Sequence, residues 1–133
     1  MKVLFISGFA TITADPKASA RFYVDTLGLP LQDDDGYRHS NEIQGAKHFG
    51  IWPLSAAAQS CFGTDQWPKD TPVPTATIDF DVDDVAAAAA EMEAAGYTLI
   101  HPARTEPWGQ TVARVLSPEG VLVGLSYAPW FRE

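Results

Sequence analysis

One arrangement occurs twice along the chain: a strand pattern, an aspartate able to cap a helix, a helix pattern, and a glycine that ends it. Asp15 and Gly28 mark this arrangement in the first half, and Asp84 and Gly96 mark it in the second. An N-cap aspartate accepts hydrogen bonds from the free N–H groups of the first turn, and glycine favours the left-handed conformation that ends a helix. Further strand patterns follow each helix, so the repeat predicts two βαβββ modules.

A single βαβββ module covers one face of its sheet with a helix and leaves the other face open. We therefore expect an α+β fold in which the two paired modules form a cupped mixed sheet, with a central groove as the natural ligand site. The 133 residues correspond to one domain. Within it we place module one at about 1–66, a proline-rich linker at about 67–74 and module two at about 75–133.

Alternation and turn residues predict the individual elements. In module one we expect strands at 3–13, 37–43 and 47–52, a turn at Asp33–Gly36, and a short helix at 56–62 capped by Ser55. In module two we expect strands at 77–82, 97–100, 111–116 and 121–127, the last two joined by a hairpin loop at 117–120.

The charge balance and the lack of long apolar segments exclude several classes of partner. The formal net charge of −8 and the pI near 4.6 disfavour nucleic acid and anionic membranes, and the nine Lys and Arg residues form no cluster. No segment approaches the roughly 18 apolar residues of a membrane span, and the N-terminus lacks the basic region of a signal peptide. We expect a cytoplasmic protein. The single cysteine, Cys61, is expected to be a small buried residue.

Four segments resemble motifs of a known family. Residues 15–29, DPKASARFYVDTLGL, resemble the first helix of the glyoxalase/bleomycin-resistance/dioxygenase (vicinal oxygen chelate) superfamily. Val82–Val85, followed by the Ala-rich helix and Gly96, resembles the second helix, and Pro107–Gln110 with Ser117–Gly120 resembles motifs of the second module. The resemblance spans nearly the whole chain in the family's order and implies the fold that the repeat predicts.

The resemblance also implies where metal ligands would stand in metal-dependent members. Counting back seven positions from the capping aspartates gives Gly8 and Thr77, and the position on the last strand falls on Gly124. The fourth ligand position, on the last strand of module one, falls on Phe49 or on Gly50, because the alignment with the family can be shifted by one residue there. Apart from the weak hydroxyl of Thr77, none of these residues supplies an oxygen or nitrogen ligand. We therefore predict no metal and no cofactor.

Strand alternation selects the side chains that face the groove. His48 and Trp52 share one face of their strand, and Thr77, Asp79 and Asp81 share the face of theirs that points to the groove or to solvent. Trp108 lies in the Pro-Trp-Gly segment that resembles the family. We predict that the ligand contacts the following side chains: Trp108, Trp52, His48, Asp79 and Thr77.

Several charged residues carry a weaker expectation. His48 with Asp79 or Asp81 remains an alternative, shifted metal site. His39 and His101 flank turns and are expected to be exposed, and Glu42 and Glu106 are expected to be solvated.

These observations leave three functions open. The first is a metal-free small-molecule binding protein that resembles the drug-sequestering, bleomycin-resistance-like members, with a ligand that is aromatic and cationic because tryptophans and carboxylates face the groove. The second is an enzyme, a lyase, isomerase or dioxygenase relative, which has relocated metal ligands or uses a carboxylate such as Asp79 as a metal-free general base. The third is an accessory domain that binds protein. The apolar C-terminal segment 127–131 also suggests a two-fold homodimer.

Overall fold

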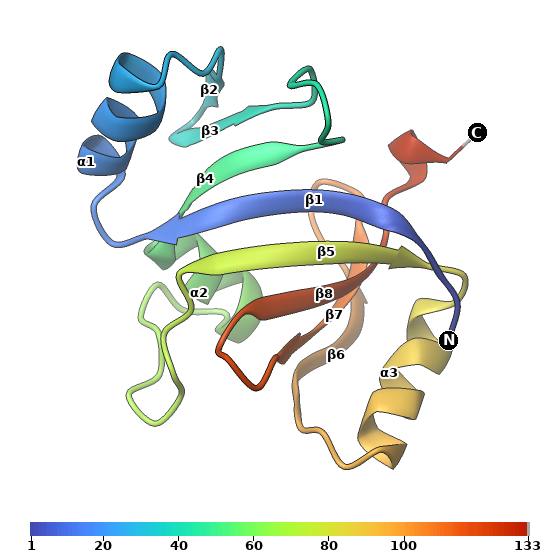
Figure 1. Ribbon diagram of the computed structural model, residues 1–133. Helices are drawn as coiled ribbons and strands as arrows, with labels where there is room; N and C mark the ends of the chain where they lie inside the picture. The colour runs from blue at the N-terminus through green and yellow to red at the C-terminus, as the bar shows by residue number, and fades with distance from the viewer. Residues whose placement is uncertain (133) are drawn as a thin grey trace.

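A single eight-stranded mixed sheet forms the centre of the computed structural model, which describes residues 1–132 (Figure 1). The strand order is β2-β3-β4-β1-β5-β8-β7-β6, and the sheet does not close into a barrel. This architecture confirms the predicted α+β fold with a cupped mixed sheet. The strands are β1 (Val3–Thr13), β2 (Gln32–Asp34), β3 (Tyr37–Ser40), β4 (Phe49–Pro53), β5 (Ala76–Val82), β6 (Leu99–Thr105), β7 (Thr111–Leu116) and β8 (Leu122–Tyr127).

The two halves of the sheet are built alike. In each half the first strand runs parallel to the last, so that β1 pairs with β4 and β5 pairs with β8. The halves join where β1 and β5 pair in antiparallel fashion, with Ala10 opposite Thr77 and Gly8 opposite Asp79. The positions that the capping aspartates select in the sequence therefore meet at the middle of the sheet.

The two aspartates cap their helices as predicted. Asp15 Oδ1 accepts a hydrogen bond of 3.1 Å from the N–H of Ala18, in the first turn of α1 (Pro16–Ala20), which continues as the π-helical turn η1 (Arg21–Thr26). Asp84 Oδ1 accepts one of 3.0 Å from the N–H of Ala87 at the start of α3 (Val85–Ala94). Past the helix ends, Gly28 and Gly96 have φ of 76° and 95°, which confirms their role.

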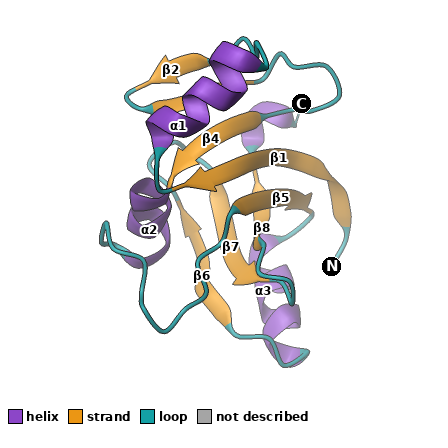
Figure 2. Cartoon of the chain, turned by 60° about the vertical axis from the view of Figure 1, so that its left-hand side comes forward, coloured by secondary structure: helices purple, strands orange, loops and turns teal. Residues whose placement is uncertain are grey.

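Two helices cover opposite faces of the sheet. Val82, Ala113 and Leu125 of the outer face pack against α3. The other face, which we call the inner face, presents Ile12 and Leu122 to α2 (Leu54–Phe62), through Ala57 and Cys61. Figure 2 shows the two helices separated by the strands of the second half. Cys61 is buried as expected. None of the helices within residues 1–132 is long and apolar enough to cross a bilayer.

Three local predictions differ from the structure. The N-cap of α2 is Pro53 and not Ser55, because the helix starts directly at the end of β4. Strand β3 ends at Ser40, where the serine hydroxyl accepts a hydrogen bond of 2.9 Å from the N–H of Glu42 and turns the chain. Strand β6 begins later and runs further than the predicted 97–100. The turn before β3 forms as predicted, with positive φ at Asp35 and Gly36.

Candidate ligand-binding groove

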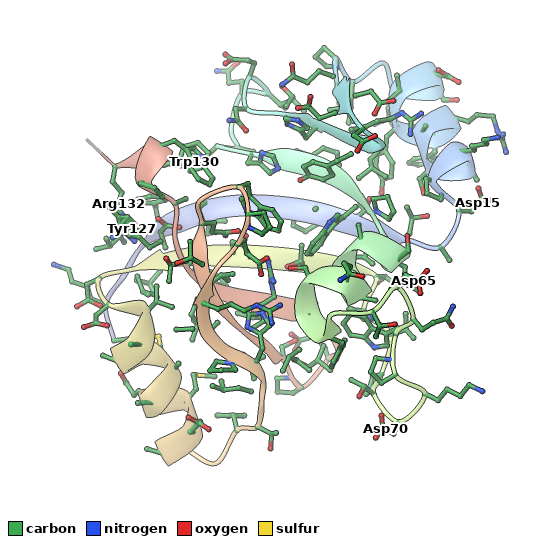
Figure 3. All side chains as sticks on the ribbon, turned by 180° about the vertical axis from the view of Figure 1, so that it is seen from behind. Asp15, Asp65, Asp70, Tyr127, Trp130 and Arg132 are labelled. Carbon is green, nitrogen blue, oxygen red and sulfur yellow. The ribbon has the colours of Figure 1, made fainter. Side chains whose placement is uncertain are left out.

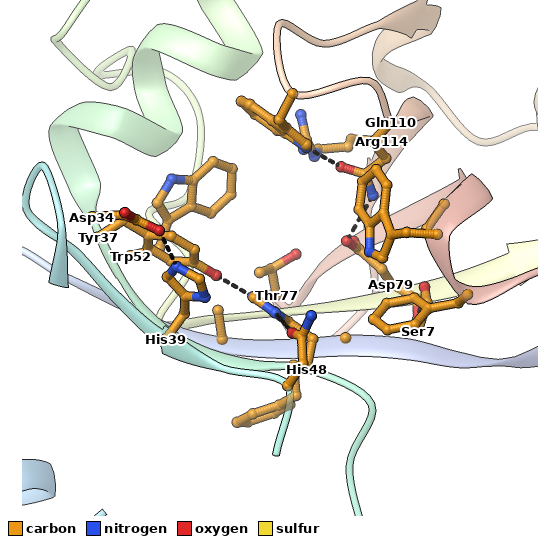
Figure 4. A pocket seen from close by; sticks show the side chains of 18 residues that line it. Ser7, Asp34, Tyr37, His39, His48, Trp52, Thr77, Asp79, Gln110 and Arg114 are labelled. Carbon is orange, nitrogen blue, oxygen red and sulfur yellow. Dashed lines mark hydrogen bonds and ion pairs between the residues drawn. The ribbon is translucent and has the colours of Figure 1, made fainter. Parts of the chain in front are cut away.

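A cavity of about 570 Å³ opens on the inner face, beside α2 (Figure 4). Strand alternation predicts that His48 and Trp52 face it, and both line it. The structure brings all of the predicted ligand-contacting side chains to this one cavity, namely Trp108, Trp52, His48, Asp79 and Thr77. Their role in binding stays a prediction.

Polar side chains and glycines alternate across the floor of the cavity. Asp79 on β5 lies between Gly8 on β1 and Gly124 on β8, and Gly124 in turn is opposite Arg114 on β7. On the far side of Gly8 lies His48, whose carbonyl accepts a hydrogen bond of 3.1 Å from the N–H of Phe9. Each glycine lies between two larger polar groups.

The strand registers settle which residue of β4 corresponds to the metal position. Ala10 pairs with Gly50 as Asp79 pairs with Gly124. Ala10 stands two residues after Gly8 in module one, as Asp79 stands two residues after Thr77 in module two. Their partners on the neighbouring strands therefore correspond, so Gly50 is the counterpart of Gly124. The position is therefore Gly50 and not Phe49, which packs on Tyr23 with ring centroids 5.7 Å apart.

The groove does not fit a metal at these positions. A Cβ atom added at Gly50 would overlap the ring of Tyr37, and one added at Gly124 would overlap the carboxylate of Asp79. The space that a ligand side chain would need is thus filled from neighbouring residues. Among residues 1–132, no group of three His, Cys, Asp or Glu side chains is arranged to hold a metal ion.

Asp81 does not face the groove or solvent, contrary to the prediction. Its side chain is fully buried, and its Oδ2 accepts hydrogen bonds of 3.0 Å from the N–H of Ala128 and from Nε of Arg132. This pairing takes Asp81 away from any shared site with His48.

A hydrogen-bonded chain forms one wall of the cavity. The Tyr37 hydroxyl lies 2.5 Å from Nε2 of His48, and Nδ1 of His48 lies 2.6 Å from Oδ1 of Asn41. Because the amide oxygen of Asn41 only accepts, Nδ1 carries the hydrogen and Nε2 accepts the tyrosine proton. Burial and the nearby His39 lower the pKa of His48 to about 4, so its imidazole is neutral at pH 7. Burial, with Asp79 nearby, raises the pKa of Tyr37 and keeps it protonated.

His39 belongs to the same wall rather than to the exposed surface that its position suggests. Its ring stacks on Tyr37 with centroids 4.9 Å apart, and its Nε2 lies 2.8 Å from Oδ2 of Asp34. Both His39 and Asp34 line the cavity (Figure 4).

Asp79 is held on the opposite wall by a second chain of hydrogen bonds. Gln110 Nε2 donates to Oδ2 of Asp79 over 3.0 Å and to the hydroxyl of Ser126 over 2.8 Å. Gln110 Oε1 accepts from Nε1 of Trp108 over 2.9 Å, which fixes the orientation of the amide. Burial raises the pKa of Asp79.

A buried cluster that sequence reasoning missed adjoins this wall. Nη1 of Arg114 lies 3.2 Å from Oε1 of Glu106, 3.2 Å from Nε2 of His101 and 2.8 Å from the hydroxyl of Ser60 on α2. His101 and Glu106 are buried and not exposed, because they surround this guanidinium. Glu42, in contrast, is exposed as expected. Arg114 also lies over the ring of Trp52, 5.3 Å from its centroid.

The C-terminal segment closes the end of the cavity at which Trp108 lies. Trp130 and Phe131 of the short helix η2 (Pro129–Phe131) line it. Arg132 follows them and anchors the segment through Asp81 and the carbonyls of Val82 and Ser126. Figure 3 shows Trp130, Arg132 and Tyr127 gathered at this end of the molecule.

Comparisons with known proteins agree with this architecture. A family model described as the Glyoxalase/Bleomycin resistance protein/Dioxygenase superfamily matches residues 6–125. A solved superfamily member from Vibrio splendidus is 15% identical, with a TM-score of 0.60 over 89% of this chain and 94% of that one. Methylmalonyl-CoA epimerases from Streptomyces coelicolor and Mycobacterium tuberculosis are 18% and 19% identical, each with a TM-score of 0.56. The match with the Streptomyces coelicolor protein covers 96% of this chain and 96% of that one. The match with the Mycobacterium tuberculosis protein covers 97% of this chain and 91% of that one. No curated protein matches the sequence.

Proposed function

Because the chain belongs to the glyoxalase/bleomycin resistance protein/dioxygenase superfamily, we propose that its groove binds a small, partly aromatic molecule without a metal. The binding would sequester the molecule, as a bleomycin-resistance-type protein sequesters a drug. One fold hosts many activities, so the residues of the groove carry this proposal and not the family alone.

The observation that carries it is the ring-lined cavity of about 570 Å³ on the inner face. Its rings come from β3, β4, the loop before β7 and the C-terminal segment, and they are Tyr37, Trp52, Trp108, Trp130 and Phe131. A cavity of this size suits a small organic molecule, and flat rings stack on a planar ligand. The glycines at the metal positions, overlaid by Tyr37 and Asp79, support binding without a metal.

The charges around the groove favour a cationic ligand. Arg114 is paired with Glu106 at 3.2 Å, and the carboxylate of Asp34 accepts a hydrogen bond of 2.8 Å from Nε2 of His39. Asp79 lies near Arg114, but its carboxylate accepts its hydrogen bond from the neutral amide of Gln110. An ammonium or amidinium group near Asp79 would supply the missing counter-charge, and the tryptophan rings would add a cation–π attraction.

A titration monitored by tryptophan fluorescence tests this function. We expect benzamidine and phenethylamine to bind more tightly than benzoate and phenylacetate, which match them in size but carry the opposite charge. A cation–π contact contributes about 0.5–2 kcal/mol, so Trp108→Ala should weaken the cationic probes by roughly two- to thirtyfold. Asp79→Asn should reduce the preference for cations by removing the charge.

Two controls make the titration decisive. Trp67→Phe changes a tryptophan that packs on Phe62 outside the cavity, and it should leave the affinities unchanged. Circular dichroism should show the same fold for each variant. Tighter binding of the anionic probes, or unaltered affinity in both Trp108→Ala and Asp79→Asn, would refute the proposed ligand class.

We also propose a two-fold homodimer in the cytoplasm. Tyr127 and Trp130 at the C-terminal end are 39% and 47% exposed, which supports an apolar contact between copies. Sedimentation at micromolar concentration should give twice the chain mass of 14.4 kDa, and a species of the single chain mass alone would contradict the dimer.

A further inference from the structure

Lys47 is an exposed cation in the loop between β3 and β4. It forms no ion pair with a carboxylate of residues 1–132. Its ammonium lies instead 5.0 Å from the ring centroid of Phe5 and 5.7 Å from that of Phe131. Arg132 is a second cation over Phe5, but it is paired with Asp81 at 3.0 Å. On a chain of net charge −8, Lys47 is therefore a local positive charge that can attract an anion.

Lys47 lines a second cavity, of about 790 Å³, whose other walls are largely apolar. The apolar side chains come from β1, β5 and the C-terminal segment, and the largest are Ile6, Phe9, Ile78 and Phe131. Ile6 is 57% exposed and Phe9 is 38% exposed, so a small molecule can reach both. A cation beside accessible apolar surface suits a molecule that is anionic at one end and apolar at the other.

A β-bulge in β1 places the apolar side chains of this cavity on one face of the sheet. Ile6 pairs with Phe80 and Phe9 pairs with Ile78, and the register shifts by one residue just after Ile6. Without the extra residue, Ile6 and Phe9 would point to opposite faces, because side chains alternate along a strand. Phe80 pairs in turn with Leu125 of the outer face, which packs on α3. Ile6, Phe9 and Ile78 therefore form one apolar patch on the outer face, which we call the outer patch.

The second cavity adjoins the ring-lined groove but differs from it in the side chains that matter for binding. Trp52, Trp108 and Trp130 line only the groove, whereas Lys47 and Ile6 line only the second cavity. The residues that line both are Gly8, Phe9, Asn41, His48 and Phe131. An alkyl chain has no ring to stack on the tryptophans, so an alkyl anion distinguishes the second cavity from the groove.

We propose that the second cavity binds a free anion with an unbranched apolar tail, of the class of medium-chain fatty carboxylates. The carboxylate lies at the ammonium of Lys47, and the tail covers the outer patch. A free molecule suits the site better than a membrane surface, because the net charge of −8 repels an anionic bilayer. This site goes beyond the proposed function and does not rest on it.

Calorimetric titration of octanoate into the full chain, below the concentration at which octanoate forms micelles, tests the site. We expect Lys47→Gln to weaken octanoate binding roughly fivefold, the upper end of what an exposed ion pair contributes. Lys47→Arg should retain the affinity, because a guanidinium also pairs with a carboxylate. Lys69→Gln, the same loss of charge at an exposed residue that lines neither cavity, should leave the affinity unchanged.

The tail and the head group of the probe are then varied separately. Decanoate should bind roughly three- to fifteenfold more tightly than octanoate, since its two further methylenes cover apolar surface. 1-Octanol has the same eight-carbon chain without the charge and should bind about fivefold more weakly than octanoate. Ile6→Ser removes part of the outer patch and should weaken both anions roughly three- to tenfold. Circular dichroism should show the same fold for each variant, because the substituted side chains are exposed.

Several outcomes would overturn this proposal. One is octanoate that binds Lys47→Gln as tightly as the unaltered chain, and another is 1-octanol that equals octanoate. Absence of octanoate binding would overturn it too, and a dimer that Ile6→Ser dissociates would then assign the outer patch to a second copy of the chain.

The proposed function fails separately from this site. Absence of benzamidine binding counts against the ring-lined groove, whatever octanoate does. Benzoate binding that Lys47→Gln weakens belongs to the second cavity and not to the groove, because Lys47 does not line the groove.

Discussion

Tyr37 and Gly50 illustrate how single residues shape the groove. The tyrosine ring lies directly over the glycine, in space that any side chain at Gly50 would need. Its hydroxyl is hydrogen-bonded to His48, so the ring cannot move aside without breaking that hydrogen bond. Gly8 lies nearby on β1 and faces open space on the side away from His48. The two glycines therefore differ in role. Gly50 allows the ring of Tyr37 to pack against the backbone, whereas Gly8 leaves space in the groove.

This difference predicts unequal effects of adding one methyl group. Gly50→Ala should lower the free energy of unfolding by about 1–3 kcal/mol, because the new Cβ overpacks a rigid ring. Gly8→Ala should change it by no more than about 0.5 kcal/mol, since its Cβ makes ordinary contacts. Urea unfolding of both variants measures the difference. Equal effects at the two positions would contradict the close packing of the Tyr37 ring against Gly50.

Residue identity predicted part of the site and missed another part. Alternation along β4 and β5 placed His48, Trp52 and Asp79 on the inner face, where they line the cavity. Arg114, Glu106 and His101 were missed because such residues are usually exposed, and their burial depends on one another. That mutual dependence arises from the pairing of β6 with β7, which local sequence does not specify.

The boundaries of the helix that begins with α1 and of α3 were predicted best because their signals are local. An aspartate before each of these two helices and a glycine after it act within a single turn. The early end of β3 depends on a serine hydroxyl that competes with strand pairing, and the position of α2 on the inner face depends on packing against both halves of the sheet. Neither of these is encoded in a short periodic pattern.

The cap of α3 can be tested at this scale. Asp84→Ala removes the acceptor for the N–H of Ala87 and should cost about 0.5–2 kcal/mol of stability. Asp84→Asn should retain most of it, because asparagine also caps well. Thermal unfolding followed by far-ultraviolet circular dichroism provides the comparison. An alanine variant as stable as the asparagine variant would show that the cap contributes little.

At the scale of the whole molecule, pairing β1 with β5 places the two halves in one sheet and forms the shared inner face. The repeat predicted that the two modules would pair, but not which strands would join them or which residues would fill the face. Two histidines on it, the half-buried His48 and the buried His101, have pKa values lowered to about 4, chiefly by burial. Nδ1 of His48 lies 2.6 Å from Oδ1 of Asn41, and Nδ1 of His101 lies 2.8 Å from the carbonyl of Pro102. The contact with Pro102 raises the pKa of His101, but burial outweighs it.

These histidines predict acid sensitivity of the fold. Between pH 6.5 and pH 4 the unfolded chain binds protons that the folded chain excludes, so stability falls as the pH falls through this window. His48→Gln and His101→Gln should each weaken the dependence of the unfolding free energy on pH. Urea midpoints at pH 7, 6, 5 and 4.5 measure it, and slopes equal to the wild-type slope would contradict neutral burial.

We expect this groove to bind a small molecule with no metal. The most direct measurement is calorimetric titration of benzamidine into protein dialysed against a chelator, repeated with added Zn²⁺ or Co²⁺. We predict binding with Kd values that agree within about twofold, since the glycines at the metal positions offer no ligand side chains. Binding that disappears with the chelator and returns with the metal, and that His48→Ala abolishes, would contradict it.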